Sequence, residues 1–457
     1  MKHLGDSVTG LKIAYIGGGS RGWAWGFMND LSEKNELSGE VYLYDIDFEA
    51  ACDNEIIGNK AGENFKYKAV KTIGEALTGA DFVIISILPG TFAEMQSDVH
   101  TPEKYGIYQS VGDTTGPGGL VRAIRTIPMY VEIAEALKEF CPEAWVINYT
   151  NPMALCIATL YKVFPEIKAF GCCHEVFGTQ KVLAKMLEAM EIAKDVDRSE
   201  IKTTPVGVNH FTWLTKAYYK DINLFPLYSE FVEKFKDGIS EKADDNWMNN
   251  FFISFEMVKF ELFKQYGQIA AAGDRHLAEF CPGNWFLKDP ETVHSWKFGL
   301  TPVSWRIEDL GNRREKSRKM VSGEMEFERK PTGEEGVNQI CALLGLRDLI
   351  TNVNMPNTGQ ISNIPLGTVV ETNAVFTSNS VAPVNSGMVP ENVYSLMAPA
   401  VCNQNVILEG MFKKDKNLLF NAFMADRLSD RLSFSEGREL FDTMLANTKD
   451  YLPDWLK

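Results

Sequence analysis

The stretch LKIAYIGGGSRGW, residues 11–23, joins an apolar run to three glycines with the spacing G-x-G-x-x-G. The run 11–17 is typical of a strand covered on both faces, and a helical pattern follows Gly22. Gly17, Gly19 and Gly22 allow a tight turn in which backbone N–H groups at a helix N-terminus approach a diphosphate. The stretch predicts a strand, a phosphate-binding turn and a helix. A tight turn without a ligand is the alternative.

An acidic residue supports the ligand-binding alternative. Asp45 ends the next predicted strand, 41–45, and follows Gly22 by 23 residues. At this place a carboxylate binds the ribose hydroxyls of NAD and repels the additional phosphate of NADP. We therefore predict an NAD site built from the three glycines, from Ser20 and Arg21 within the turn, and from Asp45.

The strand and helix rhythm continues through the first 200 residues. Three further apolar runs, 81–87, 144–150 and 167–173, alternate with segments of helix length. This alternation predicts a doubly wound, Rossmann-like parallel sheet of the α/β class. Asn151 follows the second of these runs, so we expect it at the carboxyl end of a strand, where such sheets bind ligands. We also expect Asn151 to cap the next helix, with Pro152 at its first position.

The pattern changes after about residue 200. Residues 225–280 are rich in aromatic residues and helical patterns, 355–380 indicate short strands joined by turns, and the last sixty residues again favour helices. A chain of 457 residues exceeds the roughly 250–300 residues of one core. We predict a dinucleotide-binding domain, 1–200, followed by a mixed α+β domain, 201–457, that completes the substrate site and mediates oligomerisation.

Composition and charge restrict the partners. The formal charge of −15 disfavours nucleic acid and anionic membranes, because both require clustered Lys and Arg. The charged run RREKSRK, 313–319, is expected to be a solvated face or loop. The sequence has no apolar stretch of membrane-spanning length and no secretory signal, which favours a cytoplasmic location. The eight cysteines are scattered along the chain, which favours reduced thiols.

A second chemistry-bearing stretch is GCCHEVFG, residues 171–178. Cys173 and His174 are expected at the N-terminus of the following helix, where the helix dipole would lower the pKa of the thiol. Cys172 faces the other way along the strand and is expected to be a buried structural residue. One of only six histidines, His210, lies in VGVNHFTWL, where a core histidine is the alternative to a ligand. One Cys and one His could hold a metal ion whose other positions are filled by substrate oxygens and water.

These motifs resemble glycoside hydrolase family 4, a group of NAD- and metal-dependent glycosidases that do not use the usual pair of carboxylates. The resemblance covers nearly the whole chain, in the order KIAYIGGGSRGW, LYDID, DTTGPGGLVRAIRTIP, INYTNPMAL, CHEV, GVNHFTW, GDRHLAEF and NIPLGTVVE. In this family the tetrapeptide that begins at the metal-binding cysteine follows the substrate class. CHEV resembles the subgroup that acts on α-galacturonides, whereas CHSV marks α-galactosidases or α-glucosidases.

The resemblance implies roles for particular residues. Cys173 and His210 would bind a divalent metal, usually Mn²⁺, and His174 stands where some members carry an acid catalyst. The family's base is a tyrosine, for which Tyr266 in FKQYGQIAAAGDRH is the candidate, with an ordinary structural tyrosine as the alternative. The expected substrate-binding residues are Asn151, Asp113, Glu175, Arg275 and His276, of which the last two would form a clamp for the substrate carboxylate.

The implied reaction removes and returns a hydride. The sugar C3 hydroxyl is oxidised by NAD⁺, the C2 proton is removed, the C1–O bond is eliminated, water is added, and NADH reduces C3 again. The resemblance also implies a dimer or tetramer and a small uronide substrate. Four alternatives remain open: an α-glucuronidase, an α-galactosidase, a dehydrogenase of the malate or lactate type, and a non-catalytic NAD or sugar sensor.

Overall fold

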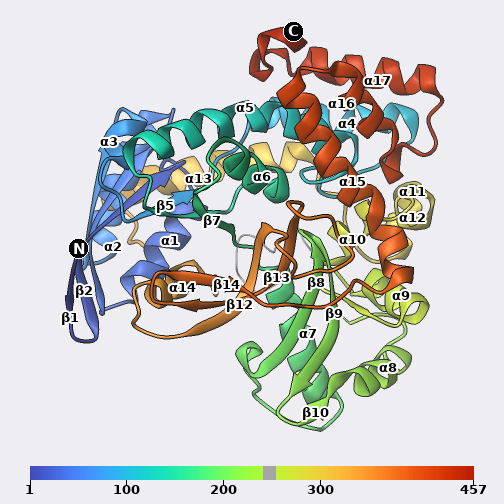
Figure 1. Cartoon of the computed structure of the whole chain (residues 1–457), viewed down its shortest axis with the longest axis horizontal. Coiled ribbons are helices and arrows are strands. Elements are labelled where there is room, and N and C mark those ends of the chain that lie inside the picture. Colours follow the sequence, from blue (N-terminus) through green and yellow to red (C-terminus); the bar gives the residue numbers. More distant parts are fainter. Residues whose placement is uncertain (240–253) are drawn as a thin grey trace.

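The computed structural model describes residues 1–239 and 254–457 (Figure 1). A ten-stranded sheet forms the centre of the N-terminal half of the chain. Its central strands pair in parallel in the order β7-β6-β5-β2-β3-β4. They are β2 (Ser7–Ile16), β3 (Leu37–Tyr44), β4 (Phe65–Val70), β5 (Phe82–Ile85), β6 (Trp145–Asn148) and β7 (Lys168–Gly171). The doubly wound α/β prediction is confirmed.

Helices cover both faces of this sheet, which explains why its strands are nearly continuous apolar runs. One face packs against α1 (Trp23–Ser32), α2 (Phe48–Ala61) and α14 (Gly336–Leu343). The other packs against α3 (Ile73–Leu77), α5 (Gly116–Phe140) and α6 (Met153–Val163). The carboxyl ends of the strands are left to hold the functional residues.

Late residues extend the same sheet. β12 (Leu349–Pro356) pairs antiparallel with β7 and is followed by β13 (Val369–Thr377) and β14 (Ser380–Pro383). Residues from both sides of position 200 therefore share one sheet, and the division into 1–200 and 201–457 stays a prediction.

A second, antiparallel sheet lies at the lower right of Figure 1. Its strands are β8 (Ile201–Val208), β9 (Phe211–Tyr219), β10 (Ile222–Asn223) and β11 (Ile269–Ala270). β8 and β9 form a hairpin whose turn carries His210. β13 touches this sheet, since the Asn373 side chain donates a 2.7 Å hydrogen bond to the Thr203 carbonyl.

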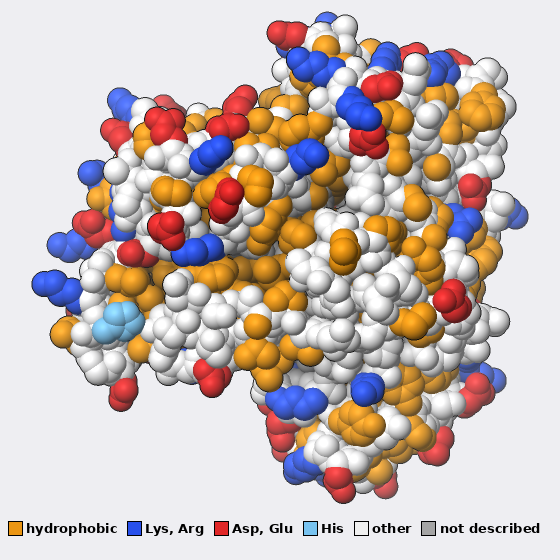
Figure 2. Space-filling model, viewed as in Figure 1, with side chains coloured by type: hydrophobic (Ala, Val, Ile, Leu, Met, Phe, Trp, Pro, Cys, Tyr) orange, Lys and Arg blue, Asp and Glu red, His pale blue; other side chains and the backbone are white. Residues whose placement is uncertain are grey.

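The C-terminal residues are helical, as predicted, in α15 (Glu391–Lys413), α16 (Lys416–Met424) and α17 (Phe434–Asn447). The charged run 313–319 lies in helix α13 (Val303–Ser322) and is mostly exposed, with Ser317 buried. Acidic and basic side chains are interspersed on the face shown in Figure 2. Over the described ranges, no helix combines the length and apolar character needed to cross a membrane.

Candidate active site

The glycine turn after β2 has the expected close contacts. Gly17 has a φ of +92°, and a Cβ at this position would lie 2.0 Å from the Ser86 carbonyl oxygen. The Gly19 N–H donates a 2.9 Å hydrogen bond to one Asp45 carboxylate oxygen, and the Asp47 N–H donates to the other at 2.9 Å. Helix α1 then begins at Trp23 without a side-chain cap from Gly22, so the N–H groups that follow Trp23 in the first turn can meet an anion.

The other turn residues also lie at this helix end. The Ser20 hydroxyl accepts a 3.2 Å hydrogen bond from the Trp23 N–H. The Arg21 guanidinium lies 3.8 Å from Asp53, and its buried Nε has no hydrogen-bond partner among the described residues.

A cavity of about 420 Å³ adjoins the head of α1, within the size range of small-molecule sites. Arg21, Gly22 and Trp23 line one side, and α13 contributes Arg313 and Lys316 on another. Cations beside an uncapped helix N-terminus suit a phosphate-bearing ligand. These features fit the predicted dinucleotide site.

Beyond β6 and β7, three side chains from distant segments meet. Asp113, His210 and His276 each offer one ligand atom, and these atoms all lie within 4.8 Å of one another. His210 sits at the hairpin turn with a φ of 64°, and its Nδ1 is 3.0 Å from the Thr114 hydroxyl. The rings of His210 and His276 lie against each other at a tilt of 34°, with centroids 3.8 Å apart.

The charges in this cluster suit a metal ion. Burial and the neighbouring His276 lower the pKa of His210 to about 3, which leaves a neutral imidazole able to bind metal. Burial alone would raise the pKa of Asp113, but Arg122 and the two histidines outweigh it and lower that pKa to about 2. The cluster thus offers a carboxylate and neutral imidazoles at neutral pH.

Cys173 follows β7 and is 5% exposed, with Asn209 and Glu175 beside its sulfur. The prediction of a lowered thiol pKa is wrong: burial, Glu371 and Glu175 raise the pKa of Cys173 well above its ordinary value, although the Glu175 N–H and Asn209 act in the opposite direction. Desolvation and nearby carboxylates exceed the helix-end effect. A divalent cation beside the sulfur would reverse this balance.

Glu175 begins helix α7 (Glu175–Ala189) and joins the cluster. Its carboxylate accepts a 2.7 Å hydrogen bond from the Gly273 N–H and lies 3.7 Å from His276 Nε2. Burial acts to raise the pKa of Glu175, but the nearby histidines and this N–H lower it to about 2. Glu175 is therefore ionised at neutral pH.

His174 links the cluster to the cavity. It is half exposed, its Nδ1 lies 3.1 Å from Glu334, and its Nε2 lies 3.6 Å from Glu175. Its ring packs on Trp23, which lines the cavity together with Glu334. Desolvation acts to lower the pKa of His174, but Glu334 and Glu175 raise it to about 9. His174 is protonated at neutral pH.

The capping role expected of Asn151 is wrong by one residue. Pro152 occupies the cap position of α6, which has no side-chain cap. The Asn151 amide instead points to the cluster, where its Nδ2 lies 3.4 Å from Asp113 and its Oδ1 is buried with no hydrogen-bond partner among the described residues. The carboxyl-end position predicted for Asn151 is confirmed.

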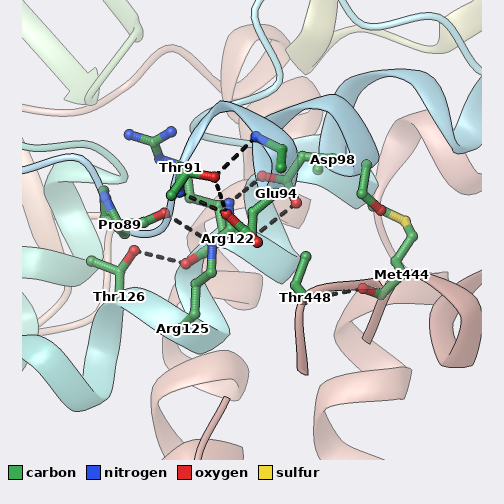
Figure 3. A network of polar contacts seen from close by, with 12 residues as sticks. Pro89, Thr91, Glu94, Asp98, Arg122, Arg125, Thr126, Met444 and Thr448 are labelled. Atoms are coloured by element: carbon green, nitrogen blue, oxygen red, sulfur yellow. Dashed lines mark hydrogen bonds and ion pairs between the residues drawn. The ribbon is translucent and has the colours of Figure 1, made fainter. Parts of the chain in front are cut away.

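Sequence reasoning missed Arg122, which lies on α5 and is 5% exposed. Its Nε donates a 3.0 Å hydrogen bond to the Asn151 carbonyl, and its Nη1 is buried without a described partner. One helical turn later, Arg125 donates to the Pro89 carbonyl and to Asp98 in a fully buried ion pair (Figure 3). Arg125 therefore stabilises the fold, whereas Arg122 faces the site. The sequence signal that could have identified Arg122 is a cationic residue within the otherwise apolar pattern GGLVRAI.

Two candidates have other contacts. The Arg275 guanidinium donates to the carbonyls of Ser110 and Gly299 and to the Thr301 hydroxyl, and mainly burial lowers its pKa to about 9. Tyr266, at the end of α9 (Met257–Tyr266), packs its ring against Trp213 at a centroid distance of 5.8 Å. None of the contacts described for Tyr266 is with the cluster, so its role as base stays a prediction.

The site also contains buried polar atoms that are unsatisfied within the described part of the chain. They are His276 Nδ1, Asn151 Oδ1 and Arg122 Nη1. Such atoms are rare in folded proteins and are normally satisfied by a partner. Their convergence beside a metal-ligating donor set fits an ion and a hydroxyl-rich substrate.

Comparisons with known proteins agree with this geometry. The sequence model of the family 4 glycosyl hydrolases matches residues 12–189, and the model of the C-terminal domain of that family matches residues 205–429. An α-galacturonidase from Thermoanaerobacterium saccharolyticum is 60% identical, over 100% of this chain and 99% of its own. The crystal structure of a putative glucosidase from Bacillus subtilis, 49% identical, superposes with a TM-score of 0.92 over 96% of this chain and 100% of its own. A 6-phospho-α-glucosidase from gut microorganisms, solved with NAD and Mn²⁺, shares the fold at 18% identity and a TM-score of 0.78 over 97% of this chain and 99% of its own. The chain belongs to family 4 of the glycosyl hydrolases.

Proposed function

We propose that this enzyme hydrolyses α-galacturonides and uses bound NAD and Mn²⁺ to do so. The observation that carries the proposal is the meeting of Asp113, His210 and His276, which Glu175 connects to Cys173: Glu175 lies 3.7 Å from His276 and beside the Cys173 sulfur. The 60% identity to a named α-galacturonidase over the whole chain supports the substrate class.

NAD would be held by the glycine turn, the head of α1 and Asp45. The metal would be held by Cys173 and His210, with Asp113 and His276 close to the same position. When bound, NAD supplies the hydride acceptor for C3 of the sugar, and the metal stabilises negative charge on sugar oxygens. The protein's own residues then have to bind the substrate, accept the protons of the C3 hydroxyl and of C2, and protonate the leaving oxygen.

A galacturonide requires a cation for its carboxylate. The Arg275 guanidinium already donates to two carbonyls and a hydroxyl. The Nε of Arg122 donates a hydrogen bond to the Asn151 carbonyl. Its buried Nη1 has no hydrogen-bond partner among the described residues. Arg122 is therefore the better-supported partner of the substrate carboxylate, in a bidentate contact. Arg122→Gln should lower kcat/KM for a galacturonide by about 10²-fold or more, while an α-galactoside, lacking the carboxylate, should lose less than about 5-fold.

Proton transfer is assigned by the charge states. His174 is protonated at neutral pH and can donate a proton from Nε2 to the leaving oxygen, which ionised Glu175 cannot do. His276 is the better-supported base: burial lowers its pKa, Nδ1 lacks a described partner, and Glu175 lies on its Nε2 side. Tyr266 remains the candidate from the family resemblance. His276→Gln should abolish exchange of the substrate C2 proton with solvent, whereas Tyr266→Phe should retain it; the reverse pattern would restore Tyr266 as the base.

The direct test is a panel of nitrophenyl α-glycosides assayed with NAD⁺, Mn²⁺ and a reductant. We expect the galacturonide to be hydrolysed with a kcat/KM at least about tenfold above those of the glucuronide and galactoside. A preference for either of these would correct the substrate. Net NADH accumulation with a hydroxy acid would indicate a dehydrogenase, and cofactor binding without turnover would indicate a sensor.

The cellular setting and assembly belong to the same proposal. All eight cysteines are unpaired, which is compatible with the reducing cytoplasm. We propose a cytoplasmic homodimer or homotetramer. Cell fractionation and light scattering of the purified enzyme test both points, and a monomer at working concentration would remove the second.

A further inference from the structure

Glu371 in β13 is a buried carboxylate with no role in the reaction outlined above. It is the one charged residue in the apolar run TVVETNAVF, 368–376, and is 0% exposed. Its described hydrogen-bond partners are three neutral donors: the Thr212 hydroxyl, Asn352 Nδ2 at 2.8 Å and Asn354 Nδ2 at 3.2 Å. Burying a carboxylate without a cation lowers the stability of the fold, so Glu371 is expected to have a role other than stabilisation.

The donors lead to both proposed metal ligands. Asn352 Nδ2 also donates a 3.0 Å hydrogen bond to the Cys173 carbonyl. Thr212 lies two residues after His210, at the start of β9, and its hydroxyl also contacts the Val208 carbonyl at 3.0 Å. One carboxylate therefore connects the end of β7 to the hairpin of the second sheet.

The hydrogen bonds hold both oxygens of Glu371 in place. One oxygen accepts from Asn352 and Asn354 on the side of Cys173, and the other accepts from Thr212 on the side of His210. Residues that orient metal ligands in this way typically contribute 10–100-fold to metal affinity.

We propose that Glu371 is a positioning residue that fixes the Cys173 sulfur and the His210 imidazole relative to each other for the divalent metal. The inference rests on the metal site proposed above. It predicts that Glu371 changes metal affinity while leaving the glycine turn after β2 unaffected, since four strands lie between β13 and β2 in the sheet.

The test measures Mn²⁺ and NAD binding separately. Free Mn²⁺ is followed by electron paramagnetic resonance during titration of the metal-free protein, and NAD binding by calorimetry. Glu371→Gln keeps the size of the side chain but replaces one acceptor oxygen with an NH2 donor, so it can no longer accept hydrogen bonds on both sides. We expect its Mn²⁺ Kd to rise about 10–100-fold, its NAD Kd to change less than about 2-fold, and its kcat to recover at saturating Mn²⁺.

A matched pair controls for folding. Asn352 and Asn354 both donate to the same oxygen of Glu371, but only Asn352 also holds the Cys173 carbonyl. Asn352→Ala should therefore weaken Mn²⁺ binding at least about 5-fold more than Asn354→Ala, and this comparison decides the matter if Glu371→Gln does not fold. Wild-type protein that binds no Mn²⁺ would overturn the metal site itself. Wild-type binding that is unchanged in Glu371→Gln, or equal losses in the two Asn variants, would overturn the role of Glu371 alone.

Discussion

Of the residues in the dinucleotide turn, Gly17 has the least space for a side chain. Gly17→Ala is therefore the most informative substitution in that turn. Its φ of +92° costs a residue with a side chain about 1–2 kcal/mol. In addition, the new Cβ would stand 2.0 Å from the Ser86 carbonyl oxygen, which is backbone and cannot rotate away. Strands β2 and β5 would have to separate by about 1 Å at their carboxyl ends, at a further cost of about 1–3 kcal/mol.

Gly79 provides a matched control. It has a similar φ of +70°, but a Cβ there would meet nothing within 4 Å. Gly79→Ala should therefore lower the free energy of unfolding by only about 1–2 kcal/mol, whereas Gly17→Ala should lower it by about 2–5 kcal/mol. Displacement of the turn should also weaken NAD binding by at least about tenfold, since each 1.4 kcal/mol is a factor of ten.

Urea unfolding and calorimetric titration with NAD measure the two effects in both variants. If Gly17→Ala unfolds like Gly79→Ala and binds NAD with the wild-type Kd, the turn does not make the close approach argued here.

Three further changes test other parts of the structure. Asp45→Ala should weaken NAD relative to NADP in competition binding, and an unchanged preference would discard its contact with the ribose. Burial raises the pKa of Asp30 to about 6, above its ordinary 3.8, so the folded state takes up protons and loses stability as the pH rises from about 4 to 6. Asp30 lies on α1, and its two oxygens accept hydrogen bonds from the Thr332 N–H and hydroxyl, so Asp30→Asn loses one acceptor at every pH. The change in the free energy of unfolding should therefore be about 1–2 kcal/mol more favourable at pH 7–8 than near pH 4; equal effects at both pH values would contradict this. Asp98→Asn leaves the buried Arg125 without its charge partner and should lower the free energy of unfolding by about 3–5 kcal/mol, whereas a loss under 1 kcal/mol would mean that water reaches the pair.

The parallel sheet could be predicted because its signals are local. The predicted strands are apolar runs followed by turn chemistry, and the glycine spacing after residue 16 requires a particular backbone. Strand β4, FKYKAV, alternates buried and exposed residues and was not predicted. The addition of β12, β13 and β14 could not be predicted, since nothing within residues 349–383 indicates pairing with β7, almost 180 residues earlier. Such pairing depends on long-range contacts that leave no periodic pattern.

The structure places several of the predicted site residues together, but one predicted pKa shift has the wrong direction. Cys173 and His210 were chosen from motifs, and Asp113, Asn151 and His276 do lie with His210. The pKa of Cys173 moves opposite to the local prediction because the folded chain buries the thiol and brings Glu371, distant in sequence, close to it. Arg122 and Glu371 were missed for the same reason: a charge in an apolar run becomes informative only when its neighbours in space are known.

The most direct test of the central claim is the reaction in D₂O with an α-galacturonide, NAD⁺ and Mn²⁺. If the enzyme oxidises C3 and removes the C2 proton, the released galacturonate should carry deuterium at C2, and omission of NAD⁺ or Mn²⁺ should abolish both the label and the product. Galacturonate that is released at full rate with its original hydrogen at C2 would contradict the account.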